Sequence, residues 1–168
     1  KKQSFAQVTN PSLAYSDLSP QVYNEKLFTE ELIIKNNLGF LLLKSNKLNE
    51  AEETFKEAIA IAKAGKQKTF QYQLEKNIGL TFTLLKQYGK AEDHYKAAEE
   101  ICAKNSDTKQ GSEILWIRAK NQYLSNNLDE ARLLCEKSIS MAKQGNFYDQ
   151  LSESYSLMVE IKDRKSVV

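Results

Sequence analysis

The side chains best suited to acid–base or nucleophilic chemistry are few in this sequence. It contains one histidine, His94, and two cysteines, Cys102 and Cys135. His94 is expected on the outer side of a helix, where an isolated histidine is typical of a protein surface rather than of a general base. The cysteines fall at core-like helical positions, where a thiol usually acts as a small hydrophobic group. Their offset along neighbouring helices also disfavours a disulfide between them.

Neither the acidic residues nor any sequence motif supplies a catalytic set. Carboxylate pairs such as Glu52–Glu53 and Glu99–Glu100 are adjacent in sequence, and adjacent side chains on a helix point apart, whereas a paired acid and base must converge. No GxxxxGK(S/T), GxGxxG, HExxH or CxxC pattern occurs, so the usual parts of phosphate, dinucleotide and zinc sites are missing. We therefore expect the chain not to be an enzyme and to need no cofactor or metal.

Composition limits the class of protein further. The chain has 168 residues, of which 41% are hydrophobic, and this suffices for one domain with a continuous core. Its 24 basic and 22 acidic residues are interspersed, which is typical of solvated helix faces, whereas a nucleic-acid surface needs a basic stripe with stacking aromatics. No apolar run approaches the roughly 20 residues of a membrane span, and no signal peptide is present. Because the chain begins with Lys1, we expect a piece of a longer protein whose targeting signal lies outside it. The two core-like cysteines fit a reducing compartment, and we expect a cytoplasmic protein.

A repeat of 40 residues organises most of the chain. One face of a predicted helix in the first copy carries residues spaced four, three and four apart, namely Ala51, Phe55, Ala58 and Ala62. Gly39, on the helix before, would let the two helices cross closely opposite Ala51, with Phe55 filling the gap beside that contact. Shifting the sequence by one and two repeats aligns these five positions with Gly79, Ala91, Tyr95, Ala98 and Cys102, and with Ala119, Ala131, Cys135, Ser138 and Ala142. Self-similarity of this kind predicts a solenoid of stacked helix pairs.

The unit resembles the tetratricopeptide repeat, in which a small residue is followed by alanine, an aromatic residue and another alanine across two antiparallel helices. The first two copies match well, whereas the third departs at Cys135 and Ser138, where smaller side chains require a neighbour to fill the space. The aromatic residue near the start of the family's unit is missing, and the period exceeds the family's roughly 34 residues. The resemblance covers residues 27–145 and implies an all-α, right-handed superhelical stack of antiparallel helix pairs.

The expected organisation has three parts: an N-terminal segment with the start of the first helix in residues 1–26, three repeats in 27–145, and a capping helix with a tail in 146–168. The predicted helices cover 20–44, 48–64, 67–86, 88–104, 108–126, 128–144 and about 147–163. Asp107 is expected to cap one of them. Gly65, Asn105 and Gly145 are expected to end helices in a left-handed conformation. Asn10–Pro11 would start a further short helix.

In related proteins the first helix of each pair lines a concave binding face. The positions matched to that face here are Ile33, Asn36, Asn37, Phe40, Leu43, Lys44, Gln73, Lys76, Asn77, Leu80, Thr83, Leu84, Glu113, Trp116, Ile117, Lys120, Tyr123 and Leu124. This mixture of apolar, aromatic, amide and lysine side chains predicts a groove for an extended peptide.

Asn37 and Asn77 stand one repeat apart, two residues before the glycines. An amide has both a donor and an acceptor, so it can hold a peptide backbone irrespective of sequence, as asparagine at this place often does in peptide-binding relatives. The alternative is that both amides bond neighbouring helix carbonyls or water. Under the binding hypothesis Asn37, Asn77 and Trp116 share one concave surface and are partly buried.

Lysines and aromatic residues complete the predicted groove. Lys44, Lys76 and Lys120 would favour a peptide carboxylate or acidic side chains. Trp116 and Tyr123, seven residues apart, share a helix face. They either anchor a ligand or pack against the last helix, and we favour the groove for Trp116 and packing for Tyr123. The predicted peptide-binding residues are Asn37, Asn77, Phe40, Lys44, Lys76, Leu80, Trp116 and Lys120.

Two function classes follow from these features. The first is an interaction module that binds a protein or an extended peptide in its concave face, with no nucleic acid bound and no membrane insertion. The alternative is a sensor or regulatory region of a larger bacterial signalling protein, such as a histidine kinase or a transcription regulator. That alternative comes from resemblance in repeat length and style.

Overall fold

A computed structural model of the chain describes residues 20–65 and 68–166, and every element in these two ranges is an α-helix. The described helices are α1 (Pro20–Lys44), α2 (Leu48–Ala64), α3 (Lys68–Leu84), α4 (Tyr88–Asn105), α5 (Thr108–Leu124), α6 (Leu128–Gly145) and α7 (Tyr148–Ser166). The short helix predicted at Asn10–Pro11 lies outside the described residues.

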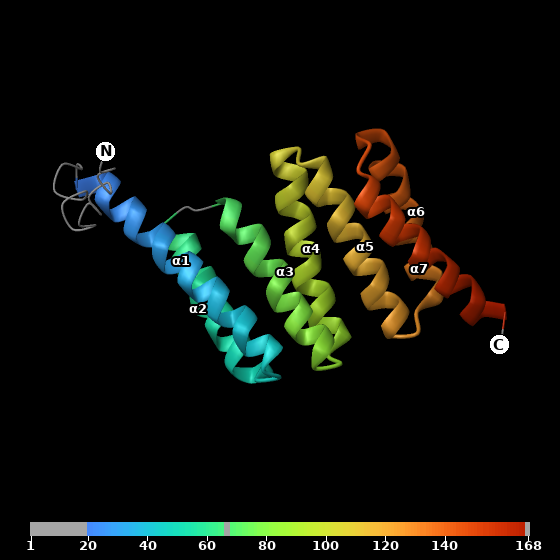
Figure 1. Cartoon of the computed structure of the whole chain (residues 1–168), viewed down its shortest axis with the longest axis horizontal. Helices are drawn as coiled ribbons and strands as arrows, with labels where there is room; N and C mark the ends of the chain where they lie inside the picture. Colours follow the sequence, from blue (N-terminus) through green and yellow to red (C-terminus); the bar gives the residue numbers. More distant parts are fainter. Residues whose placement is uncertain (1–19, 66–67, 167–168) are drawn as a thin grey trace, which may run out of the picture.

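The helix pairs follow one another in chain order along the length of the molecule, with α1 and α2 at one end and α6 and α7 at the other (Figure 1). Helix α1 packs on α2, α3 on α4 and α5 on α6, and each pair also packs on the next, while α7 covers α6. The architecture is an all-α solenoid of antiparallel helix pairs, as the repeat predicted.

The ends of the helices follow the turn residues. Asp107 caps α5 as predicted, since its Oδ1 accepts a hydrogen bond of 2.9 Å from the backbone nitrogen of Gln110. Helices α3 and α5 end two residues earlier than predicted, at Leu84 and Leu124. The positive φ angles of Lys86 and Asn126, 58° and 67°, interrupt the helical path there.

The prediction that Gly65, Asn105 and Gly145 end helices in a left-handed conformation is wrong. The described residues with positive φ are Asn46, Lys86, Ser106, Asn126 and Asn146. Gly65 has a φ of −81°, which any residue adopts. A Cβ atom at Gly145 would lie 2.2 Å from the ring of Phe147. This glycine therefore makes room for a ring, and Asn146 makes the turn.

Gly39 and Gly79 make the same kind of close contact inside the helix pairs. A Cβ atom at Gly39 would lie 2.4 Å from the ring of Phe55, and one at Gly79 would lie 2.4 Å from the ring of Tyr95. The sequence interpretation placed Ala51 opposite the glycine and the ring beside it. In the structure the aromatic ring itself occupies the space left by the missing side chain.

In the third copy the smaller residues are compensated by α7. Cys135 is fully buried, and its thiol donates a hydrogen bond of 2.9 Å to the carbonyl oxygen of Ser154. The Ser138 hydroxyl donates to the carbonyl of Ser112 at 2.7 Å and lies 2.9 Å from the Ser154 hydroxyl. The small side chains thus let α7 approach closely, and they supply the neighbour that the sequence required.

A buried ion cluster joins the second and third copies. Arg118 on α5 donates from Nε to Glu92 Oε1 on α4 at 2.9 Å, and its Nη1 also bonds Glu99. Burial lowers the pKa of Arg118, but the bonds and charges of Glu92 and Glu99 outweigh this and raise it overall. The corresponding residue of the second copy is the fully buried Ile78. The two junctions between repeats therefore differ, one being apolar at this place and the other ionic.

Alkaline pH is expected to destabilise the fold. Burial raises the pKa of Cys102 from 9.0 to about 12 and that of Cys135 from 9.0 to about 11. Both thiols ionise nearer pH 9 in the unfolded chain. Their contribution to the free energy of unfolding is therefore complete below about pH 9 and is lost as the pH rises towards 12. Urea unfolding should therefore show a lower free energy of unfolding at about pH 10.5 than at pH 8. Between these two pH values the free energy of unfolding should fall less for the Cys102→Ala variant than for the native chain. An equal fall in both proteins would contradict the prediction.

Candidate functional site

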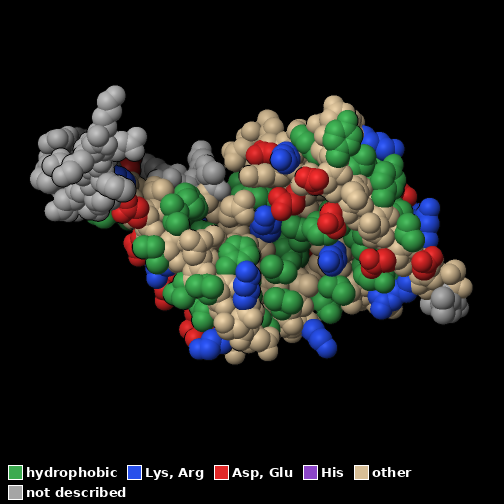
Figure 2. Space-filling model, viewed as in Figure 1, with side chains coloured by type: hydrophobic (Ala, Val, Ile, Leu, Met, Phe, Trp, Pro, Cys, Tyr) green, Lys and Arg blue, Asp and Glu red, His purple; other side chains and the backbone are tan. Residues whose placement is uncertain are grey.

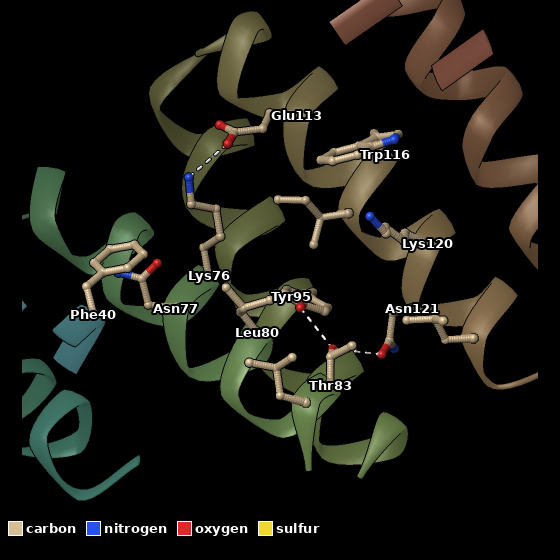
Figure 3. Close-up of a pocket in the computed structure, with 13 residues that line it drawn as sticks. Phe40, Lys76, Asn77, Leu80, Thr83, Tyr95, Glu113, Trp116, Lys120 and Asn121 are labelled. Atoms are coloured by element: carbon tan, nitrogen blue, oxygen red, sulfur yellow. Dashed lines mark hydrogen bonds and ion pairs between the residues drawn. The ribbon is translucent and has the colours of Figure 1, made fainter. Parts of the chain in front are cut away.

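The first helices of the three pairs, α1, α3 and α5, form one groove. An open pocket of about 440 Å³ lies between them, within the range typical of ligand sites. It is lined by Phe40, Lys76, Asn77, Leu80, Thr83, Leu84, Tyr95, Glu113, Trp116, Ile117, Lys120, Asn121 and Leu124. Phe40 faces the pocket from α1, and Trp116 and Lys120 face it from α5 (Figure 3).

Apolar side chains dominate the groove surface. Phe40, Leu80, Leu84 and Leu124 line it, and each is exposed by more than a third. Figure 2 shows hydrophobic side chains gathered over the middle of the molecule, with lysine and arginine among them. Large apolar groups that stay exposed together mark an interaction surface more clearly than scattered ones.

One end of the groove is closed by an ion pair between α3 and α5. Lys76 Nζ lies 2.8 Å from Glu113 Oε1, as Figure 3 shows. The Tyr72 hydroxyl donates to Glu113 Oε2 at 2.9 Å, and burial together with the Glu113 charge raises the pKa of Tyr72. Glu113 therefore compensates the charge of Lys76, one of the three lysines expected to favour a peptide carboxylate.

Lys120 supplies the uncompensated positive charge of the groove. Its Nζ lies over the Trp116 ring, 5.4 Å from the ring centroid. Of the two lysines that line the described groove, Lys120 is the one without an acidic partner. A carboxylate bound beside Trp116 would meet both a cation and an aromatic surface.

Asn77 lines the groove but is tied to α1. Its side chain is only 1% exposed, and Nδ2 donates to Asn36 Oδ1 at 2.8 Å. The expected partial burial is wrong for Asn77, because the two helices approach closely enough to enclose the amide. Asn37 is exposed and lies outside the groove lining. The amide that pairs with Asn77 is the neighbouring Asn36.

A second polar link crosses from α3 to α5, and sequence reasoning missed two of its members. Thr83 Oγ1 donates to Asn121 Oδ1 at 3.1 Å and lies 3.0 Å from the Tyr95 hydroxyl (Figure 3). Asn121 Nδ2 also donates to the carbonyl of Tyr88 at 3.1 Å. Burial raises the pKa of Tyr95 to about 12. The available signal was Asn121 itself, an amide at the repeat position where Leu41 and Thr81 stand.

The structure brings six of the eight predicted peptide-binding residues into the groove: Phe40, Lys76, Asn77, Leu80, Trp116 and Lys120. Asn37 and Lys44 are exposed outside its lining. Tyr123 also lies outside it and packs against α7, with the Arg164 guanidinium 4.7 Å from its ring centroid. Arg164 Nη1 further donates to the Tyr123 carbonyl at 2.9 Å.

His94 is not the isolated surface residue that the sequence suggested. Its ring is half-buried, stacks on Phe82 with centroids 5.4 Å apart, and has Nδ1 2.8 Å from Glu75 Oε2. The histidine thus fastens α4 to α3. Within residues 20–65 and 68–166, no group of three or more His, Cys, Asp and Glu side chains could hold a metal ion. The helices described in these ranges are all too short or too polar to cross a membrane.

Comparisons with known proteins agree with this architecture. Residues 32–64, which include all of α2, match the family model of the tetratricopeptide repeat. The sequence has no match among curated proteins. The fold is that of a tetratricopeptide-repeat solenoid, and residues 32–64 form one such repeat.

Solved structures with this fold come from several kinds of protein. The chain is similar to the tetratricopeptide domain of Arabidopsis FLU, with a TM-score of 0.65, 20% identity and coverage of 70% of this chain and 98% of that one. It is similar to the Yersinia enterocolitica secretion chaperone SycD, solved with a peptide of the translocator YopD (TM-score 0.64, 16% identity, 81% and 95% covered). Similarity to the apo form of RapI covers 75% of this chain but only 48% of that protein (TM-score 0.61, 22% identity).

Proposed function

We propose that this chain is a protein-interaction module that holds an extended peptide segment in the groove between α1, α3 and α5. The observation that carries the proposal is the row of exposed leucines, Leu80, Leu84 and Leu124, beside the unpaired Lys120. Covering exposed apolar surface with a partner favours binding by about 25 cal/mol for each Å² that is buried.

The chemistry of the groove favours one kind of ligand. Its apolar surface suits leucine-like or aromatic side chains, and Lys120 suits an acidic group placed next to them. Lys76 is less suited to this role, because a ligand carboxylate would have to displace Glu113 from it. We therefore propose a segment with apolar residues followed by an acidic residue that reaches Trp116 and Lys120.

The structural neighbours support the class of partner. SycD was solved with a peptide of its translocator, which is an example of peptide binding on this fold. We propose that residues 27–145 form the binding unit and residues 146–168 cap it, that its partner is a protein rather than a nucleic acid, and that it works in the cytoplasm without catalysis or a cofactor. The alternative role as a sensor region of a larger bacterial signalling protein has no support from a particular contact in the described residues.

The proposal predicts that a negative charge in the groove weakens peptide binding. Peptides selected from a random phage-displayed library on the native protein would be titrated by calorimetry against Leu80→Asp. We expect a loss of at least about tenfold in affinity, because the apolar contact at Leu80 is replaced by a hydrated carboxylate that also repels an acidic ligand.

Leu133→Asp is the matched control, since Leu133 is a similarly exposed leucine on α6 outside the groove. It should bind the selected peptides with unchanged affinity. Equal binding by the Leu80→Asp variant, with its helical content intact, would place the peptide site on another surface.

A further inference from the structure

Helix α1 carries an exposed apolar stripe separate from the groove. Leu27, Ile34, Leu38 and Leu41 are 43%, 65%, 45% and 62% exposed. Their spacing of seven, four and three residues places them on one face of the helix. The α1 residue that lines the groove is Phe40, on a different face. We call these four residues the α1 stripe.

The repeat shows what kind of element fits the α1 stripe. One repeat further on, Ile34 and Leu38 correspond to Leu74 and Ile78 on α3, and both of these are fully buried. The helix before α3 in the chain, α2, packs on it. The corresponding face of α5 is likewise buried at Ile114 and packs on α4. The α1 stripe thus has the form of a surface that another helix covers in antiparallel orientation.

The charges around the stripe indicate which helix this is. In the first half of α1, Glu25, Glu30 and Glu31 outnumber Lys26, which leaves a net charge of −2, whereas Lys35 and Lys44 give the second half +2. A parallel copy of the same helix would place like charges together. An antiparallel copy places Glu31 of one helix near Lys44 of the other, and does so twice. The charges of α1 are therefore complementary to those of a second α1 that runs antiparallel to it.

We propose that the α1 stripe is a dimer interface on which a second copy of this chain docks its own α1 in antiparallel orientation. The two-fold axis passes near Leu38, so that Ile34, Leu38 and Leu41 of the two helices cover each other and two Glu31–Lys44 pairs flank them. An isologous contact of this kind closes the assembly at two chains. The dimer leaves both grooves accessible, since the groove lining belongs to other faces. Lys44, which sequence reasoning assigned to the groove, serves association in this arrangement.

Sedimentation equilibrium over a range of protein concentrations tests the interface. The native chain should dimerise, and Ile34→Glu should raise the dimer dissociation constant at least tenfold, because it places two carboxylates in the apolar contact. Val159→Glu is the matched control, since Val159 is a similarly exposed apolar residue on α7 at the other end of the stack. It should dimerise as the native chain does. Circular dichroism would verify that both variants keep their helical content.

Charge exchange tests the antiparallel orientation and the identity of the partner. At low ionic strength Glu31→Lys alone and Lys44→Glu alone should each dimerise more weakly than the native chain, because each variant faces like charges. A mixture of the two variants should form heterodimers at least as strong as the native dimer, since both pairs are again of opposite sign. The proposal would be overturned if the native chain stayed monomeric at all concentrations, or if Ile34→Glu dimerised as well as the native chain. It would also be overturned if the two charge variants dimerised no more strongly when mixed than each does alone.

Discussion

Replacing Gly79 with leucine is expected to lower the free energy of unfolding by at least about 3 kcal/mol, at or beyond the upper end of the usual overpacking penalty. A Cβ atom at this position would already lie 2.4 Å from Tyr95 Cε1, and the ring is enclosed by the core. The helices α3 and α4 must then separate or the ring must leave its place. Urea unfolding followed by circular dichroism measures the change.

The matched control is Gly89→Leu. Gly89 lies in the first turn of α4, and a Cβ atom there meets nothing within 4 Å. This variant should be as stable as the native chain or more stable by up to about 1 kcal/mol, because leucine is the better helix former. If Gly79→Leu and Gly89→Leu unfolded at the same urea concentration, the close contact between Gly79 and Tyr95 would be incorrect.

The third copy suggests a compensating pair of substitutions. There Ala119 and Cys135 stand where the second copy has Gly79 and Tyr95, and both are fully buried. Gly79→Ala should therefore lower the free energy of unfolding less in a Tyr95→Cys background than in the native chain. A double-mutant cycle measures this coupling directly.

Replacing Arg118 with isoleucine is expected to destabilise the chain by about 3–5 kcal/mol, as when one partner of a buried ion pair is removed. Glu92 is only 8% exposed, and its Oε2 has no hydrogen-bond partner among the described residues, so Arg118 is its principal compensation. The measurement is again the free energy of unfolding in urea. Arg132→Ile is the control, since Arg132 is exposed on α6 and its pairing with Glu136 is long, at 4.0 Å.

The junction between the first and second copies, where the buried ion cluster is absent, indicates how the stability lost by Arg118→Ile can be regained. Ile59 and Ile78 stand there at the places of Glu99 and Arg118. Glu52, at the place of Glu92, pairs instead with Lys56 on its own helix. Lys96 stands in the equivalent place beside Glu92. The double variant Glu92→Leu with Arg118→Ile removes the buried charge together with its partner and should therefore regain most of the stability. A double variant as unstable as Arg118→Ile alone would contradict this.

The sequence was sufficient to predict the helices because the repeat aligns their turns as well as their cores. Positive φ angles occur at Asn46, Lys86 and Asn126, which are one repeat apart, and again at Ser106 and Asn146. The identity of these residues was harder to predict. Residue type favoured glycine for a left-handed position, yet lysine and serine occupy two of these places. Register in the repeat is therefore a better guide to the turns here than local residue preference.

The groove was predictable for the same reason, but its internal pairings were not. Equivalent positions on α1, α3 and α5 repeat along one face, so most lining residues could be assigned without coordinates. Which amide meets which depends on the distance between helices and on side-chain rotamers. Asn77 meets Asn36 rather than standing in line with Asn37, and Lys76 meets Glu113 on the next helix. Neither pairing leaves a pattern in the sequence.

The polar links between α3 and α5 differ in how open they are to an incoming chain. Lys76–Glu113 and Thr83–Asn121 cross the groove near its two ends. Lys76 and Glu113 keep part of their side chains exposed, so water or a polar group of a bound chain can take the place of either partner. Asn121 is buried and also bonds the carbonyl of Tyr88 on α4, so its link is part of the packing that holds the three helices together.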